Sequence, residues 1–295
     1  MTLLGGVEGG GTKFVCAVAR NDRIVERTRI DTRDAVATYA DVRDFFAAAA
    51  ARHGAIEALG IGTFGPIELD PASPDYGRVT TTPKPGWRRA SVLEALAPLG
   101  LRIALDTDVN AAALGEWAHG AGQGCGTVTY TTIGTGIGVG VVRGGVSVMG
   151  MAQFEIGHIR APRDPAADAF PGVCAYHGDC FEGLAAGPAV LARWGRDLSA
   201  ATPEQVRLIA GYAGKLAALL ALAHAPHRQV LGGGVSKAPG FLEATREAAR
   251  AELNGYVAAL PCDLSDYIVA PALGDDAGIT GALELARRSV LGEAG

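Results

Sequence analysis

Two cysteines and two histidines form the most chemically specific spacing in this chain. Cys174, His177 and Cys180 follow one another with two residues between neighbours, and fifteen residues separate His158 from Cys174. Thiolate and imidazole ligands at such separations suit a tetrahedral Zn²⁺ with all its positions filled, which is typical of a structural ion. A Cys174–Cys180 disulfide, or a loop that binds nothing, is the alternative. We predict a structural zinc site and call these four residues the metal cluster.

Two glycine-rich turns could bring backbone N–H groups close to an anion, because glycine has no Cβ. The first glycine turn is residues 9–13 and the second is residues 134–138, and each contains a threonine. The only Gly-Lys pair, at residues 214 and 215, is followed by leucine rather than the serine or threonine of a P-loop. Strand-like residues follow both turns, whereas a dinucleotide-binding fingerprint is followed by a helix. Together with the glycines at 232–234, the turns indicate phosphate binding; a plain hairpin is the alternative for either alone.

Acidic side chains follow an apolar strand at residues 106–110. Asp106, Asp108 and Asn110 lie where this strand ends and a helix is expected to begin. Open α/β folds place their ligands at the carboxyl ends of strands. A carboxylate there could take the proton of an alcohol that attacks a phosphoryl group, although either aspartate could instead cap the helix.

The elements that would position these groups occur in a repeated order. Strands expected at 3–7, 14–19 and 23–30 flank the first glycine turn, and strands expected at 128–133, 139–143 and 146–149 flank the second. The remaining segments alternate between short strands (58–63, 102–106, 229–231, 267–269) and helices (35–53, 91–99, 110–119, 202–225, 239–260, 278–291). This order predicts a duplicated α/β fold with two lobes, residues 1–118 and 119–295.

Composition narrows the functional classes. The 295 residues are 48% hydrophobic and carry a net charge of -5, which disfavours a nucleic-acid or anionic-membrane binder. The longest apolar run, Leu216–Ala223, is shorter than the roughly 20 residues of a membrane helix, and no basic signal-peptide segment is visible. Five scattered cysteines argue against a disulfide framework. We predict a cytoplasmic protein that binds neither nucleic acid nor membranes.

Several segments resemble the ROK family of sugar kinases, and within that family the chain most resembles the zinc-containing bacterial fructokinases. They cover the chain in order: GGVEGGGTKFVCAV (5–18), DTDVNAAALGE (106–116), TIGTGIGV (132–139), FEIGH (154–158), GVCAYHGDCFEG (172–183), LGGGVS (231–236) and residues 274–281. Glu8 and the metal cluster carry the likeness to fructokinases. The resemblance implies a two-lobed, actin-like (ribonuclease H-like) fold that uses ATP and Mg²⁺ to phosphorylate a hexose, with fructose to fructose 6-phosphate as the favoured reaction.

The resemblance also implies roles for individual residues. Asp108 would be the general base. The sugar would contact Gly65, Asn110, Glu155, His158 and Glu182. The nucleotide and its Mg²⁺ would contact Glu8, Gly10, Gly11, Thr12, Lys13, Gly134, Thr135, Gly136, Pro188, Gly232, Gly233, Gly234, Val235 and Ser236. Zinc held by His158, Cys174, His177 and Cys180 would orient the neighbouring Glu155 and Glu182.

Other functions remain open. A glucokinase, mannokinase or N-acetylhexosamine kinase of the same family is the enzymatic alternative. A sugar-sensing repressor would carry a helix-turn-helix domain before the first glycine turn, whereas only seven residues precede Glu8. A sugar-binding protein without activity is disfavoured by the presence of Asp108 and both turns. Apolar helices predict a homodimer, and Pro83–Trp87 is either a lid over the site or an ordinary surface loop.

Overall fold

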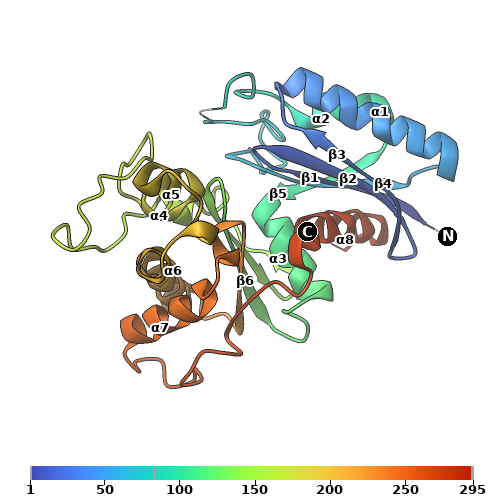
Figure 1. Cartoon of the computed structure of the whole chain (residues 1–295). Coiled ribbons are helices and arrows are strands. Elements are labelled where there is room, and N and C mark those ends of the chain that lie inside the picture. The colour runs from blue at the N-terminus through green and yellow to red at the C-terminus, as the bar shows by residue number, and fades with distance from the viewer. Residues whose placement is uncertain (1, 83, 294–295) are drawn as a thin grey trace. The chain divides into compact units, whose positions relative to one another are not determined.

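The computed structural model describes residues 2–82 and 84–293, which form two compact units (Figure 1). The first unit contains the chain up to Gly120, Val142–Gln153 and the chain from Asp275 onward. The second contains Ala121–Val141 and Phe154–Gly274. The chain first passes from the first unit to the second after Gly120, two residues later than the expected boundary at residue 118. It then returns to the first unit twice. Two later segments therefore belong with the N-terminal one.

The first sheet has the strand order β3-β2-β1-β4-β5. Its strands are β1 (Leu3–Gly9), β2 (Lys13–Arg20), β3 (Arg23–Asp31), β4 (Ala58–Thr63) and β5 (Arg102–Thr107). The first three strands pair antiparallel, while β4 and β5 run parallel to β1. The first glycine turn thus joins two paired strands at the edge where β4 and β5 also end.

Helices cover both faces of this sheet: α1 (Ala35–His53) and α2 (Val92–Leu96) on one, α3 (Asp108–His119) and α8 (Ala277–Leu291) on the other (Figure 1). Side chains of β2 alternate between the faces. Phe14 belongs to the core cluster of α1, and Val15 packs in a cluster with Ile279 of α8. At the crossing of α3 and α8, a Cβ on Gly281 would lie 1.6 Å from the Ala111 carbonyl oxygen, so only glycine permits this approach.

The second sheet repeats the topology of the first. Its strands are β6 (Thr127–Ile133), β7 (Ile137–Arg143), β8 (Val146–Ser147), β9 (Arg228–Gly232) and β10 (Ile268–Val269). Their order is β10-β9-β6-β7-β8, so β8-β7-β6-β9-β10 corresponds strand for strand to β3-β2-β1-β4-β5. This correspondence confirms the predicted duplication of a strand, glycine turn and strand.

The helices of the second unit are α4 (Phe181–Ala185), α5 (Gly187–Trp194), α6 (Pro203–His224) and α7 (Phe241–Leu253). By length and composition α6 could cross a membrane, but 61% of its most apolar window is buried inside the protein, so it serves as a core helix. The expected helix 239–260 ends early, because Asn254 and Gly255 adopt left-handed backbone angles (φ 44° and 73°). Helices α4 and α5 were not predicted, since they are short and begin in glycine-rich sequence.

Candidate active site

The first glycine turn exposes two backbone donors. The Gly10 N–H closes the turn by donating to the Lys13 carbonyl oxygen at 2.8 Å. Among the described residues, no protein group accepts from the N–H groups of Gly11 and Thr12. Adjacent N–H groups without a protein acceptor form the kind of concavity that binds phosphate oxygens.

Glu8, the last residue but one of β1, presents a carboxylate that suits a divalent cation. Its Oε2 atom is buried, and no described residue donates a hydrogen bond to it. Burial raises the pKa of Glu8 to about 7, against the opposing charge of Lys13 and together with the like charge of Asp108. A Cβ on Gly278 would lie 2.6 Å from the Glu8 Cδ atom, so glycine at the start of α8 makes room for the carboxylate. A buried carboxylate oxygen near a second acidic group fits the oxygen ligands of Mg²⁺.

The two aspartates at the end of β5 differ sharply in their surroundings. Asp106 is 5% exposed and accepts hydrogen bonds from the Thr107 N–H (2.7 Å), Asn110 Nδ2 (2.7 Å) and Ser147 Oγ (2.6 Å). Burial raises the pKa of Asp106. Asp108 is the first residue of α3, is only partly buried, and accepts from the Val109 N–H at 2.9 Å. Asp106 is therefore occupied in holding Asn110, and Asp108 is the more exposed of the two aspartates.

Neither aspartate caps the helix, so the alternative role for Asp106 and Asp108 is wrong. The N-cap of α3 is Thr107, whose Oγ1 accepts from the Asn110 N–H at 3.1 Å. Gly65, expected near the sugar, lies beyond the end of β4 in the same unit. A Cβ there would lie 2.9 Å from the Ile67 nitrogen, so the backbone leaves no room for a side chain.

The predicted nucleotide residues of the second unit lie close together. In the second glycine turn, the Gly134 carbonyl oxygen accepts from the Gly187 N–H at 2.7 Å, which brings the start of α5, including Pro188, to the turn. Gly233 has φ 91°, and a Cβ there would lie 2.4 Å from the Ile133 carbonyl oxygen. Gly232–Ser236 thus packs against the end of β6, from which residues 134–136 begin.

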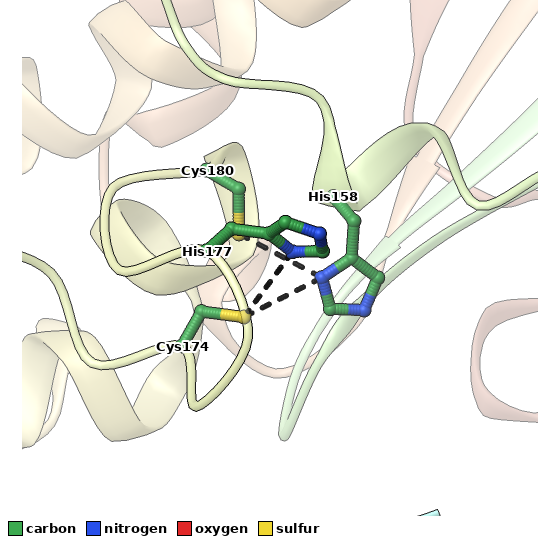
Figure 2. Close-up of side chains that lie close together, drawn as sticks. All are labelled: His158, Cys174, His177 and Cys180. Atoms are coloured by element: carbon green, nitrogen blue, oxygen red, sulfur yellow. Dashed lines mark hydrogen bonds between the residues drawn. The ribbon is translucent and has the colours of Figure 1, made fainter. Parts of the chain in front are cut away.

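The metal cluster is assembled in the second unit (Figure 2). His158 Nδ1 lies 3.6 Å from Cys174 Sγ and 3.7 Å from Cys180 Sγ, and His177 Nδ1 lies 3.7 Å from Cys174 Sγ. Zn–S and Zn–N bonds of ordinary length at a tetrahedral angle place sulfur and nitrogen about 3.6 Å apart. The donor set and its spacing therefore fit zinc. Neither cysteine is disulfide-bonded, contrary to that alternative.

Local structure explains how these ligands are held. His158 ends a 3₁₀ turn, Ile156–His158, which follows the exposed Glu155. Cys180 is the N-cap of α4, and its sulfur accepts from the Gly183 N–H at 3.4 Å. Burial, with Cys174 close by, raises the pKa of Cys180 to about 11. A bound cation would have the opposite effect, because it stabilises the thiolate.

Sequence reasoning missed a buried ion pair that holds the segment between His158 and Cys174. Asp168 forms two hydrogen bonds with Arg193 of α5, at 2.8 and 2.7 Å, and accepts from the Tyr212 hydroxyl of α6 at 2.6 Å. The Arg193 guanidinium keeps the pKa of Asp168 well below its usual range. No local sequence pattern predicts these partners of Asp168, because they lie 25 and 44 residues away along the chain.

Comparison with known proteins places this geometry in a family. Residues 4–289 match the ROK family. The fructokinase of Pediococcus pentosaceus is 41% identical over 98% of this chain and 99% of its own. The ROK hexokinase structure from Thermus thermophilus has a TM-score of 0.79 at 30% identity, covering 99% of this chain and 100% of that one. The ROK glucokinase from Streptomyces griseus, solved with glucose and AMPPNP, has a TM-score of 0.75 at 29% identity, covering 97% and 99%. The predicted actin-like α/β fold is confirmed, and the chain belongs to the ROK family.

Proposed function

We propose that this protein is an ATP-dependent hexose kinase that converts D-fructose to D-fructose 6-phosphate. The observation that carries the proposal is the contrast between the two aspartates after β5. Asp106 is buried and occupied by three donors, whereas Asp108 is partly exposed at the carboxyl end of the sheet. Sequence identity of 41% to a fructokinase over nearly the whole chain supports the choice of sugar.

In the proposed reaction, Asp108 takes the proton of the sugar 6-hydroxyl as its oxygen bonds to the γ-phosphorus of ATP. The bond from that phosphorus to the β–γ bridging oxygen breaks, and ADP leaves. Each unit contributes its glycine turn, whose backbone N–H groups would contact phosphate oxygens. Within the first unit, Asp106 holds Asn110, the expected sugar contact. Glu8 is the residue of this chain that would hold Mg²⁺, which supplies charge neutralisation to the phosphates.

Polar groups would select the sugar. Asn110 in the first unit, and Glu155, His158 and Glu182 in the second, would each pair a particular hydroxyl. A wrong epimer would leave one of these polar groups unpaired, which costs more than a misfit of one methylene. The identity to a fructokinase supports fructose as the substrate, and the similarity to a glucokinase structure makes glucose the alternative.

A coupled ADP-release assay with ATP and Mg²⁺ across fructose, mannose, glucose and N-acetylmannosamine tests this choice. We expect fructose to have the highest kcat/KM and mannose to be a weaker substrate. A kcat/KM for glucose equal to or above that for fructose would overturn the fructokinase proposal and leave the kinase proposal standing. Tight ATP binding without activity on any hexose would instead favour a non-catalytic sugar sensor.

The metal cluster would hold one structural zinc. Its sulfur and nitrogen atoms lie 3.6–3.7 Å apart, as a tetrahedral site requires. All of its ligands come from the protein, which leaves no position for substrate. Zinc would therefore act by bracing the segments of Glu155 and Glu182.

A homodimer and a cytoplasmic location complete the proposal. Apolar side chains are exposed at Leu191 of α5, at Leu222 of α6 and at Tyr176, which lies between Cys174 and His177, and a second copy could cover some of them. Light scattering of the purified protein measures the oligomeric state directly, and a monomer at micromolar concentration would contradict the dimer.

A further inference from the structure

Three carbonyl groups of the first glycine turn accept hydrogen bonds from two distant segments. Thr32, which follows β3, donates its hydroxyl to the Gly10 oxygen at 2.9 Å and its N–H to the Thr12 oxygen at 3.0 Å. Lys84 Nζ donates to the Gly11 oxygen at 2.6 Å. A turn that binds an anion through its N–H groups must keep its carbonyl oxygens directed elsewhere. Here Thr32 and Lys84 hold those oxygens.

Because peptides are planar, these contacts also fix the direction of the Gly11 and Thr12 N–H groups. A trans peptide is planar, so its C=O and the following N–H point in opposite directions. The Lys84 ammonium on the Gly11 oxygen therefore fixes the direction of the Thr12 N–H, as Thr32 on the Gly10 oxygen does for the Gly11 N–H. A charged donor also polarises the peptide, which makes its N–H a stronger donor to an anion.

The segment that carries Lys84 is anchored in the core of the first unit. Trp87 is fully buried, its Nε1 donates to the Arg33 oxygen at 2.7 Å, and its ring stacks on Phe14 at 5.6 Å between centroids. The Lys84 N–H donates to Thr82 Oγ1 at 3.2 Å. Pro83, part of the segment expected to be a lid or a surface loop, lies outside the described residues. A buried anchor three residues away thus sets where Lys84 reaches the turn.

We propose that Lys84 is a positioning residue for phosphoryl transfer. It orients and polarises the Gly11–Thr12 peptide so that the Thr12 N–H donates to a phosphate of the bound nucleotide. The inference rests on the proposed kinase function, and it gives a specific role to a residue that the sequence placed only in a lid or a surface loop. Its contact is with the turn rather than with the sugar side of the site, so its loss should affect nucleotide binding and turnover and spare sugar binding.

The test compares Lys84→Met with Lys84→Arg and with Arg88→Met, which removes an exposed cation from the same segment. Calorimetry gives the Kd for AMPPNP with Mg²⁺ and the Kd for fructose alone, and steady-state kinetics gives kcat. Losing one charge-assisted hydrogen bond predicts a Kd for AMPPNP about tenfold higher and a kcat about tenfold lower in Lys84→Met. Fructose affinity should stay within about twofold. Lys84→Arg should recover part of the loss, and Arg88→Met should behave as wild type.

Two results would overturn this inference. One is Lys84→Met with wild-type AMPPNP affinity and kcat. The other is an equal loss of fructose and AMPPNP affinity in Lys84→Met, together with a lowered melting temperature, and the same losses in Lys84→Gln, which keeps a neutral donor. Lys84 would then have a purely structural role. If the wild type phosphorylates no hexose, the proposed function fails, but AMPPNP binding by these variants still decides the role of Lys84.

Discussion

Glu182 Oε2 accepts a hydrogen bond from the backbone N–H of Ile137 at 3.0 Å. Ile137 is the first residue of β7 and lies in the second glycine turn, whereas Glu182 belongs to α4, two residues after Cys180. The other carboxylate oxygen, Oε1, lies 3.8 Å from His158 Nε2. One side chain therefore connects the metal cluster to the turn expected to bind phosphate, in addition to its expected contact with the sugar.

Replacing Glu182 with alanine should consequently weaken the binding of both substrates. A hydrogen bond to a charged group contributes about 1.5–3 kcal/mol, so we expect the KM for fructose and the KM for ATP each to rise about tenfold or more. Glu155→Ala, which removes an exposed carboxylate three residues before His158, should raise only the KM for fructose. Steady-state kinetics with each substrate varied in turn gives both values. An unchanged KM for ATP in Glu182→Ala would show that the hydrogen bond to Ile137 does not contribute to ATP binding.

Asp108→Asn should lower kcat by about 10²–10⁴, the range for a positioned general base, with much smaller changes in substrate affinity. Asp106→Asn makes the informative comparison, because its carboxylate meets three donors. An amide keeps an oxygen for Thr107 and Asn110 and places its NH₂ at the Ser147 hydroxyl, which can accept, but the hydrogen bonds are no longer charge-assisted, so Asp106→Asn should lower the free energy of unfolding by about 1–3 kcal/mol. Turnover assays and urea unfolding of both variants separate the roles. Near-normal turnover in Asp108→Asn, with none in a folded Asp106→Asn, would reassign the base.

The raised pKa of Glu8 predicts a pH-dependent stability in magnesium-free buffer. Its folded-state pKa is about 7, against an ordinary value of 4.5, so the folded state binds the proton more tightly than the unfolded state. Glu8 should therefore contribute stability that is fully present below about pH 4.5 and is lost as the pH rises through about 7. Thermal melts across this range should show the decline, and Glu8→Gln should flatten it.

Magnesium supplies the complementary measurement for Glu8. A cation that binds the carboxylate competes with the proton, so the affinity of the nucleotide-bound protein for Mg²⁺ should rise with pH through about 7 in the wild type. The same rise should be weaker in Glu8→Gln. Equal pH profiles for the two proteins, in both melting temperature and Mg²⁺ affinity, would show that Glu8 does not titrate near neutrality.

Metal analysis of the purified protein should find about one zinc per chain, the content of a single closed tetrahedral site. Removing it with a chelator, or replacing Cys174 with serine, should lower the melting temperature and raise the KM for fructose, because the ion braces the segment of Glu182. Cys262→Ser provides the control, since Cys262 is exposed and lies outside the cluster. Active, freshly purified protein without zinc would contradict this proposal.

Several features of this protein were predictable from sequence because they are local or periodic. The cysteines and His177 of the metal cluster lie within seven consecutive residues, so their spacing alone brings them near one another. Strand patterns around each glycine turn repeat, and the observed sheet orders match the duplication that they predict. A helix such as α1 begins and ends as expected, at Ala35 and His53, because its apolar face and its closing glycine are both visible in the sequence.

Tertiary structure alone decided which polar groups meet. Asp106 is distinguished from Asp108 by a bond to Ser147, Glu182 reaches Ile137 45 residues earlier, and Lys84 reaches Gly11 73 residues earlier. The early end of the expected helix 239–260 is different, because Asn254 and Gly255 are residue types that favour left-handed backbone angles and are a local signal that sequence reasoning missed. Composition and periodicity report which face of an element is buried. They do not report which other element supplies the hydrogen-bond partner, because that depends on strand order and on how closely glycines let the backbones approach.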